Sequence, residues 1–204
     1  MERLNAVLFP LVNAPANPNP AILSLALFAA NWVLYAVVAV LAVLWLTGRQ
    51  DRRQGLLHAI AVAVLALMMN FFIASLWYHP RPFELGTGHQ FLVHAPETSF
   101  PSDHATILFA LAFGLFSAGT SRGVAVLALI AAMLVAWGRV YVGVHWPMDM
   151  AGSVVIAAIA TGLFAVIGQW PVFDGLWRLV LGLHDRILDR LHIPANLIPR
   201  SDVR

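Results

Sequence analysis

The chain has 204 residues, of which 60% are hydrophobic and 11% are charged, whereas soluble domains average about 45–50% apolar and about 25% charged residues. Together with a mean hydropathy of +0.79, this composition indicates a protein embedded in lipid, and its length allows five or six helices of about 20 residues but no separate soluble domain. The absence of cysteine and lysine excludes thiolate and Schiff-base chemistry, and a net charge of +2 is too small for a nucleic-acid-binding face.

The first 20 residues are predicted to lie on the membrane surface. Apolar residues recur with helical spacing over residues 1–13, so this stretch can place one apolar face on the headgroups. No basic segment followed by a continuous apolar stretch is found here, which argues against a cleavable signal peptide. The proline- and asparagine-rich residues 13–20 then read as a linker.

Five apolar runs follow, and they predict an all-α membrane bundle with five transmembrane helices. The runs are Ala21–Leu46, Leu56–Leu76, Ala105–Ala118, Gly123–Val142 and Met150–Ile167. Four are long enough to span a bilayer, but the third would reach only about 21 Å unless it extends beyond its ends. A buried or re-entrant helix is the alternative for that run.

The carboxyl-terminal segment, residues 169–204, is predicted to be an amphipathic tail. Its apolar residues have helical spacing with charged residues between them. Asp174 and Arg178 interrupt the first turns, which argues against a sixth span.

Most arginines lie in three segments that five alternating spans would place on one side of the membrane. They are Arg49, Arg52, Arg53, Arg122, Arg178, Arg186, Arg190, Arg200 and Arg204. The positive-inside rule makes that side cytoplasmic. The amino terminus, the long loop before the third run and the start of the fifth run are then outside.

The predicted outer side carries polar residues that a membrane boundary does not require, and such residues are candidates for function. Ser102 precedes the third run as a potential N-cap, so the free amides of the first helical turn can face an anion. Arg139 lies near the outer end of the fourth run and Arg81 lies between two prolines. Each guanidinium can bind a phosphate through two oxygens.

His145 and Asp149 are spaced as a histidine held by a carboxylate. Proline is favoured at the first position of a helix, so the fifth span is predicted to begin at Pro147 with Asp149 in its first turn. Asp149 can then accept a hydrogen bond from one ring nitrogen of His145 and leave the other as a lone pair facing the anion site. His104, with an ordinary pKa of about 6.5, can protonate the departing oxygen. This set predicts nucleophilic attack on phosphorus.

These residues, in this order and spacing, resemble the three-part signature of the type 2 phosphatidic acid phosphatase superfamily. The three parts are Arg81-Pro82, Pro101–His104, and Arg139 with His145 and Asp149. Within the superfamily, two segments are most similar to the BcrC-type bacterial undecaprenyl-diphosphate phosphatases: Phe100–Ala105 and Gly138–Asp149. The similarity covers residues 20–168 and the short amphipathic start.

The resemblance implies a metal-independent phosphatase without a cofactor, which converts undecaprenyl diphosphate to the monophosphate on the outer face of the bacterial plasma membrane. By position, His145 matches the nucleophile that becomes phosphohistidine, Asp149 the carboxylate that orients it, and His104 the general acid. The implied phosphate site contains Arg81, Ser102 and Arg139, with Asp103 beside them.

The resemblance also sets the expected organisation and partners. The chain is expected to be a single membrane phosphatase domain, residues 1–204, with its catalytic core at 21–168, an outer interfacial segment at 1–20 and a cytoplasmic tail at 169–204. A polyprenyl diphosphate lipid and the membrane are the expected partners, nucleic acid is not, and the oligomeric state is open.

Two positions depart from the pattern of the superfamily. Ala74 stands where the wider superfamily has a lysine, so one cation is lost, and His79 or a helix-terminal amide is a candidate replacement. Asp103 stands where many relatives have glycine; it adds a negative charge that can influence the protonation of His104.

Several alternatives remain open from the sequence. Single histidines at a membrane boundary usually serve only as hydrogen-bonding residues, and this applies to His79, His89 and His94. Glu84 and Glu97 are expected to be solvated, and Asn70 either bridges two helices or lines the site. A metal site is the weaker hypothesis, because no compact motif such as H-E-x-x-H is found.

The function also has rivals. Within the enzyme class they are a phosphatase for phosphatidic acid or phosphatidylglycerol phosphate and a lipid phosphotransferase. Outside that class they are a lipid transporter and a catalytically silent scaffold, both of which need an anion site but no nucleophile.

Overall fold

The computed structural model describes residues 1–119 and 122–201 of the chain, so Arg204, predicted to be cytoplasmic, lies outside the described residues. In chain order the elements are α1 (Glu2–Val12), α2 (Pro20–Thr47), α3 (Gln50–Leu76), the 3-10 helix η1 (Pro82–Leu85), α4 (Asp103–Ala118), α5 (Arg122–Tyr141), α6 (Pro147–Ile167) and α7 (Pro171–Arg190). The prediction of an all-α membrane bundle is confirmed. Four helices, α2, α3, α5 and α6, are long and apolar enough to cross a membrane, and α4 is a shorter apolar helix.

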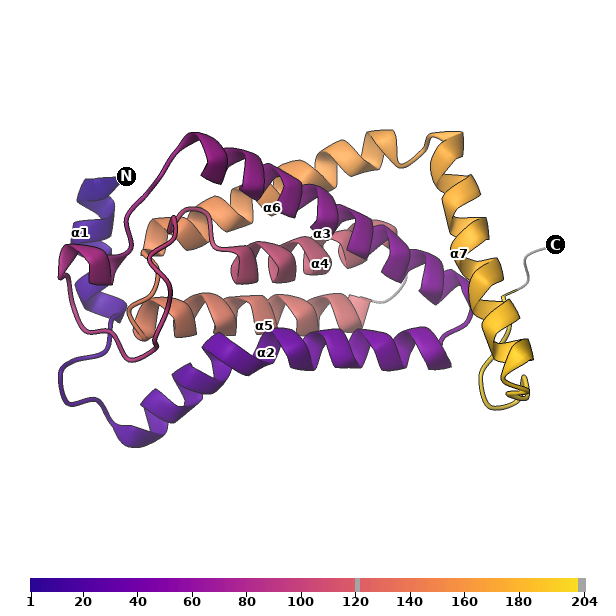
Figure 1. Ribbon diagram of the computed structural model, residues 1–204, viewed down its shortest axis with the longest axis horizontal. Coiled ribbons are helices and arrows are strands. Elements are labelled where there is room, and N and C mark those ends of the chain that lie inside the picture. Colours follow the sequence, from indigo (N-terminus) through magenta and orange to yellow (C-terminus); the bar gives the residue numbers. More distant parts are fainter. Residues whose placement is uncertain (120–121, 202–204) are drawn as a thin grey trace.

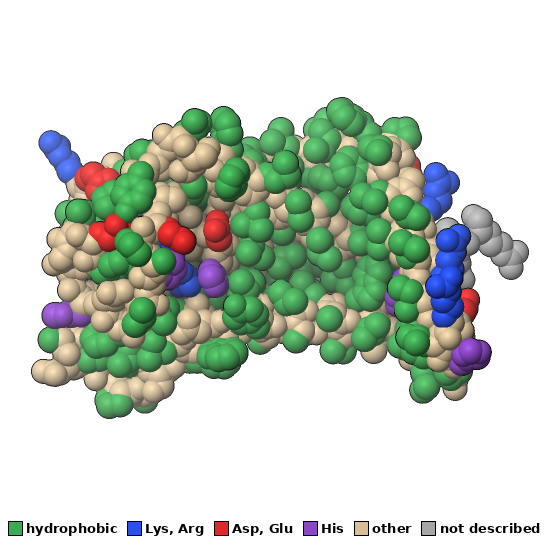
Figure 2. Space-filling model, in the orientation of Figure 1, with side chains coloured by type: hydrophobic (Ala, Val, Ile, Leu, Met, Phe, Trp, Pro, Cys, Tyr) green, Lys and Arg blue, Asp and Glu red, His purple; other side chains and the backbone are tan. Residues whose placement is uncertain are grey.

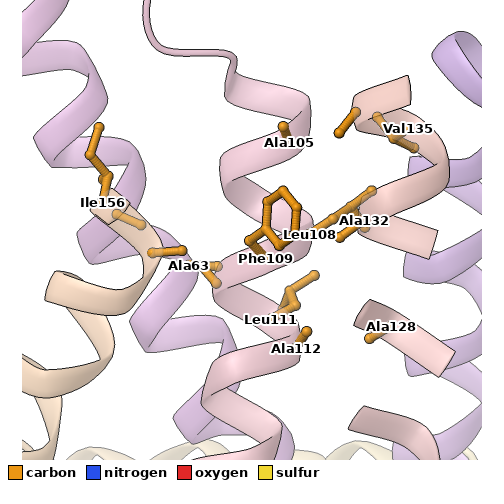
Figure 3. Close-up of a cluster of buried hydrophobic side chains, with 14 of the residues drawn as sticks. Ala63, Ala105, Leu108, Phe109, Leu111, Ala112, Ala128, Ala132, Val135 and Ile156 are labelled. Atoms are coloured by element: carbon orange, nitrogen blue, oxygen red, sulfur yellow. The ribbon is translucent and has the colours of Figure 1, made fainter. Parts of the chain in front are cut away.

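The short helix α4 lies at the centre of the bundle (Figure 1). It packs against α3, α5 and α6, and its buried Leu108 and Phe109 belong to the main hydrophobic core (Figure 3). Gly114 allows α3 to approach closely, since a Cβ there would lie 2.7 Å from the Cα of Ala59. With 16 residues, α4 is about 24 Å long. It begins farther inside the bundle than the neighbouring ends of α5 and α6 (Figure 1).

Polar connections lie at the two ends of the bundle, and apolar side chains cover the middle. The end with α1 and residues 77–102 and 142–146, hereafter the α1 end, is opposite the end with α7 and residues 48–49, hereafter the α7 end (Figure 1). On the face shown in Figure 2, charged and histidine side chains gather toward these two ends, and a green apolar band separates them. This distribution is that of a multi-pass membrane protein.

The start of α3 differs from the prediction. The sequence predicts a span beginning at Leu56, whereas α3 begins at Gln50 and includes Arg53. Arg53 is fully buried, and its guanidinium donates hydrogen bonds to the carbonyl oxygens of Trp45 at 2.9 Å and Pro199 at 2.7 Å. It therefore caps a carbonyl that the end of α2 leaves free and holds the carboxyl-terminal segment against the α7 end.

The predicted amphipathic tail forms α7, which lies across the end of the bundle (Figure 1). Leu181 and Leu188 are buried in it. The indole N–H of Trp45 donates to Nδ1 of His184 at 3.2 Å. A polar side-chain contact thus joins the tail to the end of α2, and two leucines of the tail are buried.

Candidate active site

A cavity of about 480 Å³ lies at the α1 end, where α3, α4 and α5 meet the loop of residues 77–102. Five of the seven predicted site residues line it: Arg81, Asp103, His104, Arg139 and His145. Asp149 lies behind His145 and is fully buried. Ser102 is also fully buried but is not part of the lining. Residues from separate parts of the sequence therefore meet at one site.

His145 lies in the short connection between α5 and α6, and its two ring nitrogens have different neighbours. Its Nδ1 is 3.2 Å from Oδ2 of Asp149, and its Nε2 is 3.1 Å from Nη1 of Arg81. A guanidinium can only donate, so Nε2 carries the lone pair and the proton is on Nδ1. Burial lowers the pKa of His145 well below its ordinary value, and the nearby Arg139 and Arg81 lower it further, against the hydrogen bond to Asp149. The imidazole is therefore neutral at physiological pH.

Asp149 is held in the first turn of α6, which begins at Pro147 as predicted. Its Oδ2 accepts hydrogen bonds from the backbone N–H of Trp146 at 2.8 Å and from the hydroxyl of Ser99. These donors fix the carboxylate, so that it can orient the ring of His145.

A second histidine, His79, lies near Oδ1, the other carboxylate oxygen of Asp149. Its Nδ1 is 3.5 Å from Oδ1 of Asp149, and its Nε2 is 3.0 Å from Oε1 of Glu2 on α1. The carboxylate of Asp149 raises the pKa of His79, Glu2 raises it further, and burial opposes both. His79 thus links the amino-terminal helix to the carboxylate behind His145.

Arg81 is fixed by backbone carbonyl groups. Its side chain donates to the carbonyl oxygens of Glu97 at 3.0 Å, Val144 at 2.8 Å and Thr98 at 3.3 Å, in addition to its contact with His145. These acceptors hold the guanidinium directly beside the lone pair of Nε2.

Arg139, in the last turn of α5, is the second cation of the cavity. Its Nη1 donates to the carbonyl oxygen of Ala30 at 3.2 Å, and its Nη2 lies 3.0 Å from Nε2 of His94. Its Nε is buried and has no hydrogen-bond partner among the described residues. This guanidinium therefore retains a donor for an anion.

The start of α4 differs in one respect from the prediction. Ser102 occupies the N-cap position, but its side chain makes no capping hydrogen bond, and its buried hydroxyl has no partner among the described residues. Asp103 and His104, in the first turn, face the cavity. Asn70 of α3 also lines the cavity. Its side-chain amide donates to Oδ1 of Asp103 at 2.8 Å and to the hydroxyl of Thr106 at 3.0 Å, both on α4. Asn70 therefore both bridges two helices and lines the site.

Several residues that contact the site lie outside the sequence motifs that predicted it. Ser99 and the histidines His79 and His94 contact site residues, although nothing in their spacing distinguishes them from His89, which is exposed and outside the cavity lining. Glu84, expected to be solvated, accepts hydrogen bonds from the backbone N–H of Arg81 at 2.8 Å and from the hydroxyl of Tyr78. These contacts depend on how the long loop folds, which helical periodicity does not specify.

The arrangement is suited to nucleophilic attack on a bound anion. A neutral nitrogen with its lone pair lies in a cavity that also holds two guanidinium groups and a further histidine, His104. Among residues 1–119 and 122–201, no three histidine, aspartate or glutamate side chains are grouped as a metal site requires.

Comparisons with known proteins show which family the chain resembles. Residues 55–173 match the PAP2 superfamily. The chain is 40% identical to YbjG of Escherichia coli (strain K12), over 83% of this chain and 85% of that protein. It is 30% identical to the undecaprenyl-diphosphatase BcrC of Bacillus subtilis (strain 168), over 92% of this chain and 95% of that protein. The crystal structure of Aquifex aeolicus LpxE has the same fold, with a TM-score of 0.61 and 23% identity over 78% of this chain and 93% of that chain.

Proposed function

The chain belongs to the PAP2 superfamily, and we propose that it hydrolyses undecaprenyl diphosphate, or a similar polyprenyl diphosphate, to the lipid monophosphate and phosphate. The observation that carries the proposal is the unprotonated Nε2 of His145, which lies 3.1 Å from Nη1 of Arg81 while Nδ1 of the same ring lies 3.2 Å from Oδ2 of Asp149. The similarity to a relative named undecaprenyl-diphosphatase supports the choice of substrate.

In the first step, Nε2 of His145 forms a bond to the terminal phosphorus, and the bond from that phosphorus to the bridging oxygen breaks. The bridging oxygen leaves with the electron pair and takes a proton from His104. Arg81 moves its donor from the lone pair of Nε2 to a phosphoryl oxygen, and Arg139 binds another. The ring of His145 becomes cationic, and its Nδ1 keeps its proton, which stays hydrogen-bonded to the carboxylate of Asp149.

In the second step, water releases the phosphoryl group. His104, now neutral, takes a proton from the water, whose oxygen bonds to phosphorus while the bond to Nε2 breaks. Phosphate leaves, and both histidines return to their starting protonation states. The cycle is closed by side chains of the cavity and requires no metal ion or cofactor as a reactant.

The chemistry favours a diphosphate over a simple phosphate ester. A lipid phosphate is a weaker base than the alkoxide of a lipid alcohol, so it departs more readily. Because Ala74 contributes no cation to the lining, a substrate with a better leaving group suits this site.

We also infer the orientation of the chain in the membrane and its domain organisation. The arginine distribution supports an outer location for the α1 end in the bacterial plasma membrane and a cytoplasmic location for the α7 end. Residues 21–168 are then the catalytic core of a single domain, with residues 1–20 at the outer interface and 169–204 in the cytoplasm.

The experiment is phosphate release by the purified protein in detergent, with undecaprenyl diphosphate, phosphatidic acid and phosphatidylglycerol phosphate at matched surface concentrations. We expect the highest kcat/KM for the diphosphate and no loss of activity with a chelator. His145→Ala is expected to reduce release by at least about 100-fold while the lipid still binds.

Other results would favour the rivals. Preference for either glycerophospholipid would change the substrate but retain the chemistry, and transfer of the phosphoryl group to a second lipid would indicate a phosphotransferase. If the wild-type protein binds the lipid but releases no phosphate from any substrate, the proposal is wrong and a transporter or scaffold replaces it.

A further inference from the structure

His94 lies in the cavity although it belongs to none of the signature segments of the sequence. It comes from the loop between α3 and α4, and its ring centroid is 6.3 Å from that of His145. Its Nδ1 is 3.0 Å from the carbonyl oxygen of Ala95, and its Nε2 is 3.0 Å from Nη2 of Arg139. Since the guanidinium can only donate, Nε2 accepts and Nδ1 carries the proton. The ring is therefore neutral in the empty cavity.

The neutral form also follows from its surroundings. Burial lowers the pKa of His94, and the charges of Arg81 and Arg139 lower it further, against the hydrogen bond to Ala95 and the charge of Glu97. The charged or titratable groups around it come from the loop itself, from α4, from α5 and from the α5–α6 connection: Arg81, Glu97, Asp103, His104, Arg139 and His145.

The empty cavity has too little positive charge for a diphosphate. Apart from its histidines, the lining contains two guanidinium groups, of Arg81 and Arg139, and two carboxyl groups, of Glu97 and Asp103, so the formal charge of these four groups is zero. The protonated His104 of the proposed mechanism adds only one positive charge. A diphosphate ester carries about two to three negative charges near neutral pH, because the second pKa of a phosphate is about 6. If the diphosphate bound in this cavity without further positive charge, part of its negative charge would stay unpaired.

Among the described residues of the lining, three histidines can add a cation. His145 must keep its lone pair to act as the nucleophile, and His104 must deliver its proton to the leaving oxygen. His94 is the remaining group, and it already contacts Arg139 with the nitrogen that would gain the proton.

We propose that His94 is a further substrate-binding residue. When the lipid enters the cavity, Nε2 of His94 gives up its hydrogen bond with Arg139, takes up a proton from solvent and donates a hydrogen bond to the diphosphate. This inference rests on the proposed function. The same change frees Nη2 of Arg139 to donate to a phosphoryl oxygen. The substrate then accepts two additional hydrogen bonds, one from His94 and one from Arg139. Binding is then coupled to the uptake of one proton.

The coupling fixes the direction of the pH dependence. The anion raises the pKa of His94 in the complex above its value in the empty cavity, so affinity falls as the pH rises between these two values. A lysine at this position, which stays protonated, would remove that dependence.

The test compares KM and kcat of the wild type with those of His94→Gln and His94→Lys, on polyprenyl diphosphate between about pH 6 and about pH 8.5. At the lower pH we expect His94→Gln to raise KM about 10-fold to 100-fold, as for the loss of a charged hydrogen bond, with a much smaller change in kcat. The wild-type KM should approach that of His94→Gln as the pH rises. His94→Lys should restore a low KM at the higher pH.

His89→Gln, an exposed position on the same loop, is the matched control and should behave as the wild type. The inference is overturned if His94→Gln keeps the wild-type KM and its pH profile. It is also overturned if His94→Lys binds no better than His94→Gln, because His94 would then only hold Arg139 in place. Loss of phosphate release in the wild type itself would contradict the proposed function instead.

Discussion

At the scale of single residues, the site depends on which atom holds each proton. A guanidinium group donates hydrogen bonds but accepts none. The contact of Arg81 with Nε2 of His145 therefore places the lone pair of that ring on Nε2. The contact of Arg139 with Nε2 of His94 does the same for the second ring. Asp149 and the carbonyl of Ala95 hold the opposite, protonated nitrogens. One ring is thereby arranged as a nucleophile, and the other as a group that can gain a proton when an anion arrives.

The His79 contact predicts a pH-dependent contribution to stability. The folded protein raises the pKa of His79 above its unfolded value of about 6.5 through Asp149 and Glu2. The contribution is therefore complete below that value and is lost as the pH rises through the folded-state pKa. We expect His79→Gln to lower Tm in detergent by about 2–6 °C near pH 6, and the difference from wild type to shrink toward pH 9. A Tm difference that stays constant over this pH range would show that His79 contributes only by packing.

The residues that sequence reasoning found are those that belong to local patterns. The position of Pro147 predicts the start of α6, and the four-residue spacing predicts that Asp149 meets His145; both are confirmed. The contact of Asp149 with His79 and that of Arg139 with His94 join residues 70 and 45 positions apart through an irregular loop. Periodicity and capping say nothing about such contacts, because they are set by the fold of the loop.

At the scale of helices, apolar runs predict the spans well but not their polar ends. The run beginning at Leu56 is correct as a hydrophobic segment, yet α3 starts at Gln50 because Arg53 turns inward to carbonyl groups of α2 and the carboxyl-terminal segment. In a hydropathy pattern a charged arginine marks the end of an apolar run, so the predicted span begins after Arg53. Inside the protein, Nε and Nη2 of Arg53 donate to carbonyl oxygens, which offsets part of that cost.

The short third run has a structural reason. Helix α4 is surrounded by α3, α5 and α6, so it need not match the thickness of the lipid by itself. Because it begins inside the bundle (Figure 1), the space beyond its first turn is available to the loop of residues 77–102. That space is lined by Asp103 and His104 and forms part of the cavity. The length of this run is therefore linked to the presence of the site.

At the scale of the whole molecule, the two ends have different chemical character, and the proposed orientation can be tested directly. The chain has no cysteine, so a single introduced thiol reports one position. In intact cells we expect a membrane-impermeant maleimide to label Gln90→Cys at the α1 end, and to label Arg186→Cys at the α7 end only after permeabilisation. Both positions are exposed. The reverse pattern would place the cavity on the cytoplasmic side.

The central claim is that a phosphoryl group passes through Nε2 of His145. The most direct measurement is rapid acid-free quenching of the purified protein with a polyprenyl diphosphate labelled in its terminal phosphate, followed by mass spectrometry of its peptides. We predict a phosphoryl group on His145 that is labile to acid and stable to alkali, that disappears as phosphate is released, and that is lacking in His145→Ala. Phosphate release by the wild type without any phosphorylated His145, or with the label on another residue, would contradict the mechanism.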